Sequence, residues 1–197
     1  MSAERVNEDE FRLILLARQG DREAYGALAA RHYAGVIQVV YRMCGEPQLA
    51  EDAAQEAFIR AWLKLGSFQP KAAQAPASFR NWLYRIAMNA ALDVLRRKPA
   101  ASIDDVDASL LADPALGPEA ALLQKEQSER VQAAVQALPE GARAVVVLRE
   151  YSGLSYQEIS DVLDIPVGTV MSRLNYARTK LRDALEWYPA ETEREHD

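Results

Sequence analysis

Cysteine and histidine are almost missing from this chain of 197 residues. It contains one cysteine, Cys44, and two histidines, His32 and His196. A single cysteine excludes an internal disulfide, and so few nitrogen and sulfur ligands exclude a His/Cys metal cluster. We therefore expect no metal site and no cofactor, and the low cysteine content fits a reducing cytoplasm.

Long hydrophobic runs are also missing. No apolar run approaches the roughly 18 residues that suggest a membrane span, and the first residues lack the pattern of a signal peptide. We expect no direct membrane insertion and a cytoplasmic location. No nucleophile, base and orienting group occur together, so we expect neither catalytic residues nor enzyme activity. Hydrophobic residues still make up 49% of the chain, which is enough for a folded core.

The charges are unevenly distributed along the chain, whose net charge is −6. Residues 61–98 contain seven basic residues and one acidic residue, whereas residues 99–119 contain five acidic residues and no basic one. Local fields matter for binding as well as the total charge, so the basic segment is compatible with nucleic acid. A chain that is acidic overall is expected to bind DNA weakly alone and to depend on a partner.

Apolar residues recur at spacings of three and four, which predicts an all-α protein. We expect two helical domains joined by a flexible acidic linker, with a helix-turn-helix in the second. The predicted boundaries are a first domain at 1–98, a linker at 99–118, a second domain at 119–187 and a tail at 188–197. The predicted helices cover residues 8–18, 22–44 with Asp21 as its cap, 48–65, 78–98 with Ser78 as its cap, 119–138 and 139–151.

A helix-turn-helix is predicted at residues 154–181. Ser155 and Glu158 have the spacing of a capping box, and Pro166 suits the first turn of a second helix. In that helix Val170, Leu174, Ala177 and Leu181 form the buried side. Gly168, Ser172, Asn175, Tyr176 and Thr179 then face outward, and four basic residues precede the first acid. Such a helix fits the major groove of duplex DNA, whereas the simpler alternative is a plain amphipathic hairpin.

The helix predicted at residues 48–65 has two different sides. Its core side carries Ala54, Ala57, Phe58, Ala61, Trp62 and Leu65. Its other side carries Asp52, Gln55, Glu56, Ile59 and Leu63, a mixture of polar and aliphatic groups typical of a protein-binding surface. Packing of another helix of the same domain on this side is an equally good interpretation of the pattern.

Basic and aromatic residues alternate on the helix predicted at residues 78–98. We expect a core side of Phe79, Trp82, Leu83, Ile86, Ala90 and Val94, and exposed flanks with Arg80, Asn81, Tyr84, Arg85, Met88 and Asn89. The basic side chains of such flanks can bind the backbone of single-stranded nucleic acid, and the aromatic side chains can stack on its bases. A solvated amphipathic helix is the alternative. The preceding segment, residues 66–77 with Pro70 and Pro76, is predicted to be a loop that could form one wall of a pocket for an extruded base.

Three segments in this order, AEDAAQEAFIRAW at 50–62, SFRNWLYRIAMNAALDVLRR at 78–97 and LSYQEISDVLDIPVGTVMSRLNYARTKL at 154–181, closely resemble bacterial sigma factors of the extracytoplasmic-function subclass. The resemblance implies that core RNA polymerase is bound by Asp52, Gln55, Glu56 and Ile59. It implies that the minus-ten element is read as a single strand by Arg80, Asn81, Tyr84, Arg85 and Asn89. The minus-thirty-five duplex is then read by Thr169, Met171, Ser172, Asn175, Tyr176 and Arg178.

The chain departs from the family at Met171 and Tyr176, where basic residues are frequent, and at Met88, where arginine is frequent. The promoter sequence is therefore left open. The resemblance also implies an anti-sigma partner and an acidic linker that follows the RNA exit path of polymerase. From the residues alone, two other hypotheses remain: a dimeric helix-turn-helix regulator that acts without polymerase, and a helical adaptor that binds only protein.

Overall fold

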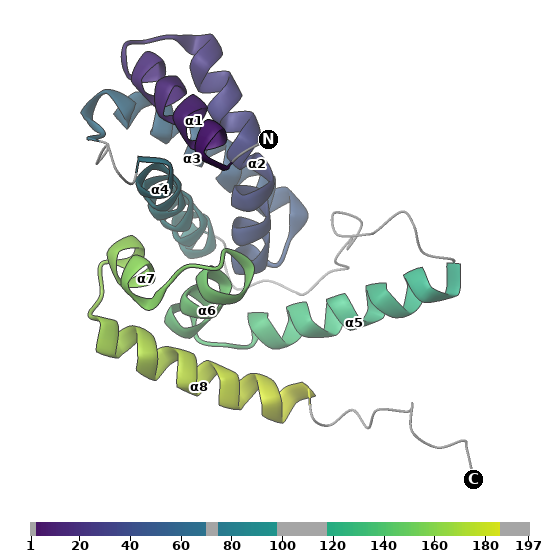
Figure 1. Ribbon diagram of the computed structural model, residues 1–197. Coiled ribbons are helices and arrows are strands. Elements are labelled where there is room, and N and C mark those ends of the chain that lie inside the picture. Colours follow the sequence, from purple (N-terminus) through teal and green to yellow (C-terminus); the bar gives the residue numbers. More distant parts are fainter. Residues whose placement is uncertain (1–2, 70–74, 98–117, 186–197) are drawn as a thin grey trace.

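The computed structural model describes residues 3–69, 75–97 and 118–185. Every regular element in these ranges is helical, which confirms the predicted all-α class. The elements form an N-terminal block, α1 to α4, and a C-terminal block, α5 to α8, which pack against each other (Figure 1). Their bounds are α1 Ala3–Arg18, α2 Arg22–Cys44, α3 Pro47–Lys64, the 3₁₀ turn η1 Leu65–Ser67, α4 Ala75–Arg97, α5 Pro118–Gln136, α6 Glu140–Val146, the π-helical turn η4 Val147–Tyr151, α7 Tyr156–Leu163 and α8 Val167–Leu185.

Helix α2 begins and ends at the residues that its local sequence favours. Asp21 Oδ1 accepts hydrogen bonds from the backbone N–H groups of Glu23 and Ala24 at 2.9 and 3.0 Å, which confirms the predicted cap. Gly45 ends the helix at a φ of 78°, a left-handed conformation that costs least for glycine. Pro47 then starts α3, where its missing N–H costs nothing.

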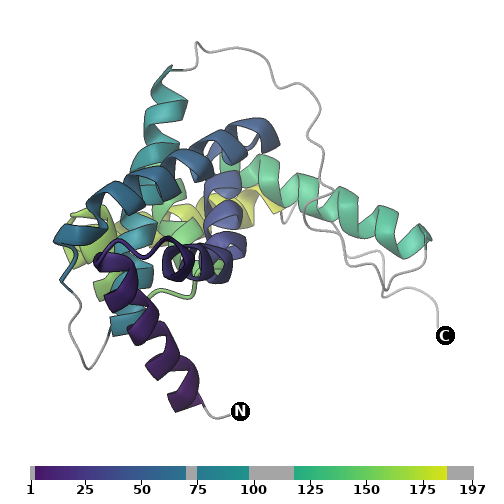
Figure 2. The ribbon, with the colours of Figure 1, turned by 90° about the horizontal axis from the view of Figure 1, so that it is seen from above.

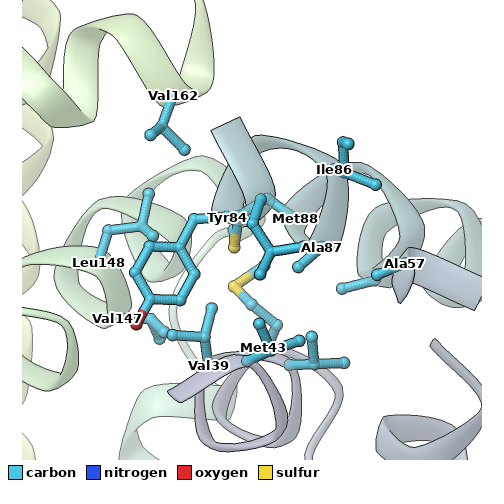
Figure 3. Packing of buried hydrophobic residues seen from close by; sticks show 14 of the residues in the cluster. Val39, Met43, Ala57, Tyr84, Ile86, Ala87, Met88, Val147, Leu148 and Val162 are labelled. Carbon is cyan, nitrogen blue, oxygen red and sulfur yellow. The ribbon is translucent and has the colours of Figure 1, made fainter. Parts of the chain in front are cut away.

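Alanines bring α3 and α4 close together. Ala57 and Ala61 of α3 and Ala87 of α4 are completely buried, and Figure 3 shows Ala57 beside Ala87. Small side chains at a helix crossing allow the shortest distances between helix axes. An ion pair of 2.8 Å between Arg60 and Asp93 joins the two helices at their edge and lowers the pKa of Asp93. The helix that carries the predicted polymerase surface is therefore firmly attached to the helix that carries the predicted minus-ten residues.

Aromatic side chains fix the start of α4. The Phe79 ring is 1% exposed, and its centroid lies 5.8 Å from that of Phe68, 5.7 Å from that of Trp82 and 5.3 Å from that of His32. Ring pairs at such distances add to the stabilisation that burial provides. Because Phe68 follows η1 directly, this cluster holds the chain just before residues 70–74, which lie outside the described part.

The C-terminal block is built around four fully buried residues, Leu148, Leu154, Ile159 and Leu174. The π-helical turn η4 precedes the helix-turn-helix and carries Leu148 into this core. Helix α5 extends from the block with its first residues far from the other helices, as Figures 1 and 2 both show. The block contacts α4 through α7, and it contacts α2 through η4, α5 and α6.

The two blocks share one hydrophobic core. Val39 and Met43 of α2 belong to the same buried cluster as Val147 and Leu148 of η4, and Figure 3 shows them around the ring of Tyr84. Burial of apolar surface is the main favourable contribution to such packing. The sequence left open how the two domains are arranged, and in this structure they are in direct contact.

Three polar side chains of the C-terminal block, which we call the latch, bind the C-terminal end of α2. Gln136 Nε2 donates to the carbonyl of Arg42 at 2.8 Å, and Arg143 Nη1 donates to that of Met43 at 2.9 Å. Gln132 Oε1 accepts from the buried guanidinium of Arg42 at 2.7 Å. The last carbonyls of a helix lack partners within it, so the latch supplies them from another block.

The predicted cap at Ser78 is wrong. Helix α4 begins at Ala75, with Pro76 in the first turn, where proline is tolerated. Part of the predicted loop 66–77 is therefore helical, and another part forms η1. Helix α1 begins at Ala3 rather than at residue 8, whereas the predicted linker and tail lie almost entirely outside the described residues. None of the described helices has the length and apolarity to cross a membrane.

Candidate nucleic-acid interface

The predicted helix-turn-helix is present, with its capping box intact. Ser155 Oγ accepts from the backbone N–H of Glu158 at 3.2 Å, and the carboxylate of Glu158 accepts from the N–H of Ser155 at 2.8 Å. Helix α7 ends at Leu163, and the residue that follows it, Asp164, has a φ of 56°. Helix α8 begins at Val167, directly after Pro166. Two helices joined by this short turn have the connection expected of a DNA-binding hairpin.

Helix α8 has the two sides that its sequence predicts. Val170, Leu174 and Ala177 are buried, and Leu181 is half-buried against the core. The residues predicted to read duplex DNA lie on the other side: Thr169 is half-buried, whereas Met171, Ser172, Asn175, Tyr176 and Arg178 are exposed. Met171 and Tyr176 are 54% and 46% exposed, which is unusual for side chains of their size. An exposed row of polar and large apolar groups can contact base edges and thymine methyl groups.

Two of the arginines of α8 lie against other elements of the C-terminal block, and one of them is paired with an acid. Arg178 Nη2 lies 3.0 Å from Glu150 Oε1, and this hydrogen bond raises the pKa of Arg178. The guanidinium of Arg173 lies over α6, where a Cβ added to Gly141 would meet it at 2.9 Å. Lys180 and Arg182 are exposed. Arg178 would therefore have to break its ion pair with Glu150 before it could contact a phosphate.

The flank of α4 that the sequence predicts to be exposed is largely covered. Arg80 and Asn81 are half-buried, and Arg80 Nη2 and Asn81 Nδ2 both donate to Glu158 Oε1, at 3.1 and 3.0 Å. Arg85 and Asn89 are exposed, with Arg85 3.7 Å from Asp164. The predicted exposure is wrong for two residues, Tyr84 and Met88, which are 8% and 1% exposed. The physical reason is that the Tyr84 side chain lies against Gly35 of α2 and, as Figure 3 shows, near Val147 and Leu148 of η4.

The carboxylate of Glu158 is held in its ionised form. Partial burial raises its pKa, but hydrogen bonds from Asn81 and from both groups of Ser155, together with the charge of Arg80, lower the pKa to about 2. Because this value is below the ordinary one of 4.5, the ionised carboxylate stabilises the folded chain above that pH. This stabilisation is lost as the pH falls from about 4.5 toward 2.

The predicted polymerase surface of α3 is exposed. Ile59 and Leu63 are 56% and 75% exposed, and Asp52, Gln55 and Glu56 are exposed beside them. Within the described residues, no other helix packs on this side, which contradicts the alternative of a buried fourth-helix contact. Glu56 is paired with Arg60 one turn later at 2.8 Å, so its carboxylate is oriented along the helix. Two aliphatic side chains in a polar frame form a small surface suited to a protein partner.

The contacts between the two blocks were missed by reasoning from the sequence. Glu158 was recognised only as a capping residue, and Gln132, Gln136 and Arg143 were not singled out. Hydrogen bonds between residues more than 70 positions apart leave no periodic pattern in the sequence. The two glutamines at i and i+4 on α5 are the one local hint, because they place two amide groups on the same face.

Comparison with protein families identifies both blocks. Residues 28–100 match the family Sigma-70 region 2, and residues 128–181 match Sigma-70, region 4. The RNA polymerase sigma-H factor of Pseudomonas aeruginosa is 37% identical over 92% of this chain and 96% of that protein. The sigma factor SigW of Bacillus subtilis, an extracytoplasmic-function protein, is 36% identical over 85% of this chain and 92% of that protein.

Solved structures show the same architecture. CnrH in complex with the cytosolic domain of CnrY is similar with a TM-score of 0.68 and 26% identity, over 92% of this chain and 99% of that chain. The sigma factor RpoE of Bartonella quintana, in complex with the anti-sigma factor NepR, is similar in fold with a TM-score of 0.65 and 19% identity, over 82% of this chain and 96% of that chain.

Proposed function

Because the chain belongs to the extracytoplasmic-function family of RNA polymerase sigma factors and is a transcription initiation factor, we propose that it acts through one polymerase contact and two DNA contacts. The proposed boundaries are a first domain at 1–98, a linker at 99–118, a second domain at 119–187 and a tail at 188–197. The chain works in the cytoplasm and performs no covalent chemistry. Its task is to select a promoter and to open it.

Core polymerase binds at the exposed stripe of α3. Asp52, Gln55 and Glu56 provide polar groups that fix the register, and Ile59 provides the apolar centre. The 56% exposure of Ile59 supports this assignment, because an aliphatic side chain in that position loses contact with water only when a partner covers it. Attachment of α3 to α4 through Arg60 and Asp93 transmits the position of the polymerase contact to the minus-ten helix.

The minus-ten element binds α4 as a single strand. Arg80 and Arg85 contact its backbone, and Asn81 and Asn89 provide donors and acceptors for unpaired bases. Tyr84 can stack on a base only after it has been uncovered, since it is 8% exposed and lies beside Gly35 of α2 and near Val147 and Leu148 of η4 (Figure 3). The minus-ten contact therefore requires a rearrangement of the two blocks, whereas the polymerase contact does not.

The minus-thirty-five element binds α8 as a duplex. Ser172 and Asn175 contact base edges, and Thr169, Met171 and Tyr176 shape the apolar part of the contact. Arg178 contacts the phosphate backbone after it leaves Glu150. The observation that carries the proposal is the exposed face of α8, which is the second helix of a fully formed helix-turn-helix.

Polymerase makes the two weak DNA contacts selective. Two modules held on one body bind with a high effective concentration, so the pair is far tighter than either module alone. An anti-sigma factor regulates the chain by competing for these surfaces. The proposal of an anti-sigma partner is supported by the similar fold of RpoE, whose structure was solved in complex with the anti-sigma factor NepR.

The test is reconstitution with core polymerase that has no initiation factor of its own. We expect the chain to bind core and to open a promoter recovered by selection of bound DNA with the holoenzyme. Opening is measured by the fluorescence of 2-aminopurine placed in the minus-ten element. A chain that forms a stable homodimer and binds palindromic DNA tightly without polymerase would instead be a helix-turn-helix regulator.

Replacement of Asn175 by alanine is expected to reduce discrimination at one base pair of the minus-thirty-five element by about 1–3 kcal/mol, because a base-edge contact is lost. The measurement is the affinity of the holoenzyme for promoters that differ at single positions. Lys180→Ala provides the contrast, since loss of an exposed lysine weakens all promoters to the same degree. A uniform loss for Asn175→Ala would assign that residue to the backbone.

A further inference from the structure

A carboxylate lies beside the basic residues of α8. Glu150 Oε1 accepts a hydrogen bond from Arg178 Nη2 at 3.0 Å, and both side chains are 51% exposed. Figure 1 shows α8 along the outer edge of the C-terminal block, with α6 and α7 on one side of it. In the part of the chain that the structure describes, the other basic residues of α8 form no ion pair: Arg173, Lys180 and Arg182. Glu150 therefore lies at the edge of the surface proposed for the minus-thirty-five duplex.

Local structure turns Glu150 toward α8. The preceding residue, Arg149, is held inside the turn, since its Nη1 donates to the carbonyl of Leu154 at 2.7 Å and its guanidinium lies 5.2 Å from the centre of the Tyr156 ring. The π-helical turn η4 thus uses its basic side chain internally and presents its acidic one to α8. The hydrogen bond with Glu150 is the main reason that the pKa of Arg178 is raised, and Tyr156 acts in the same direction. Both η4 and the start of α7 therefore hold Arg178 in its ion pair.

The ion pair changes what Arg178 can contribute to DNA binding. A free guanidinium that contacts a phosphate releases counterions from the duplex, and this release drives binding. A guanidinium that is paired with a carboxylate has no net charge to offer, and the carboxylate repels phosphates. Asn175 precedes Arg178 by one turn on the same side of α8. The charge of Glu150 is thus placed next to a residue that is proposed to read a base.

We propose that Glu150 is a specificity-determining residue, which restrains Arg178 in the free chain and keeps the affinity of α8 for duplex DNA of arbitrary sequence low. This role rests on the proposed function and deepens it. Phosphate contacts carry no sequence information, so a weaker backbone contact makes a larger share of the binding depend on base edges. Ion pairs between half-exposed side chains are weak, and polymerase, which holds the duplex against α8, breaks this one at little cost.

The first test replaces Glu150 by glutamine in the full chain without polymerase. The substitution keeps the shape of the side chain and removes its charge. The probes are two fluorescent duplexes of equal length, one with the minus-thirty-five element selected by the holoenzyme and one with that element scrambled. We expect Glu150→Gln to bind both duplexes about two- to fivefold more tightly, the size of effect expected for an exposed ion pair. The logarithm of the affinity should also fall more steeply with the logarithm of the salt concentration, by about 0.9, because one phosphate contact is added.

The matched control is Glu126→Gln. Glu126 lies on α5 and pairs with Arg130 at 3.9 Å, so the change removes the same charge from a similarly exposed ion pair of the same block. This variant should bind both duplexes like the unaltered chain, with the same dependence on salt. If the affinities of Glu150→Gln equal those of the control, or if the gain is confined to the selected sequence, the proposal is overturned.

The second test asks whether the gain in affinity depends on Arg178. Arg178→Ala removes the partner of Glu150, and the glutamine substitution is then added to it. If Glu150 acts by restraining Arg178, the added substitution should change neither the affinity nor its salt dependence. A gain of the same size with and without the arginine would indicate direct repulsion between Glu150 and DNA, and it would overturn the restraint.

The role of Glu150 and the proposed function can fail separately. Selection of promoters with the holoenzyme comes first, because it supplies the duplex and tests the proposed function with the unaltered chain. If the holoenzyme opens a promoter and Glu150→Gln gains no affinity, only the role of Glu150 is wrong. If the holoenzyme opens no promoter, the proposed function fails and the role of Glu150 fails with it.

Discussion

Replacement of Ile59 by arginine is expected to reduce the affinity of the chain for core polymerase at least about tenfold, and up to about a hundredfold if Ile59 is a central contact. Ile59 is 56% exposed on α3, with Gln55 and Glu56 beside it. In the free chain an arginine at this position remains in water, so the fold should be unaffected. In the complex it would bring an unpaired charge into an apolar contact, which is costly. The measurement is competition for fluorescently labelled core polymerase at equilibrium.

The control for this experiment is Leu15→Arg. Leu15 lies on α1 and is 37% exposed, so the substitution has the same chemistry on a different surface. Both variants should unfold at the temperature of the unaltered chain. Equal weakening by the two substitutions would indicate a general effect of added positive charge. Unchanged core affinity for Ile59→Arg would exclude this part of α3 from the polymerase contact.

Features that depend on residues close in the chain could be predicted from the sequence. The capping box of Ser155 and Glu158, the cap at Asp21 and the end of α2 at Gly45 all involve partners within four residues. The two sides of α3 and α8 follow from a period of 3.6 residues. Each of these helices packs on its neighbours with one side and exposes the other, so a single apolar stripe is enough to locate the core.

Helix α4 could not be assigned correctly by the same reasoning, because it is covered on two sides. It packs on α2 and α3 within its own block and also on α7 of the C-terminal block. Tyr84 and Met88, four residues apart, form a second buried stripe that was interpreted as part of an exposed aromatic flank. Tyrosine fits either place, since its ring is apolar and its hydroxyl is polar. The positions of α2 and of the C-terminal block decide between them, and no local pattern encodes those positions.

The latch was missed for a related reason. Gln132 is 3% exposed, yet glutamine is a residue that usually lies at the surface. Its burial is tolerated because it accepts a hydrogen bond from Arg42, 90 positions earlier in the chain. A polar residue whose partners belong to another domain looks like an ordinary surface residue in the sequence. The contact between the two blocks therefore depends on residues that sequence reasoning treats as neutral.

Replacement of Phe79 by alanine is expected to destabilise the chain by about 3–5 kcal/mol, the range measured for deletion of a buried aromatic ring. Its ring is 1% exposed and contacts the rings of Phe68, Trp82 and His32. A small domain has only about 5–15 kcal/mol of stability in total, so this loss is a large part of it. The measurement is urea unfolding followed by circular dichroism, with the midpoint and slope compared with those of the unaltered chain.

Two further variants serve as controls. One tests whether the loss of stability comes from the lost volume, and the other tests whether removal of any aromatic ring has the same effect. Phe79→Leu retains most of the volume and should cost less than about 1.5 kcal/mol. Phe58→Ala removes a half-buried ring that stacks on Tyr33 at 6.0 Å, and it should cost less than Phe79→Ala. Equal losses for the two alanine variants would contradict a central role for the Phe79 cluster. Phe79 directly precedes Arg80, so a loosened cluster also displaces the first residue proposed to contact the minus-ten element. Promoter opening by the holoenzyme with Phe79→Leu should therefore fall more than the affinity of this variant for core polymerase.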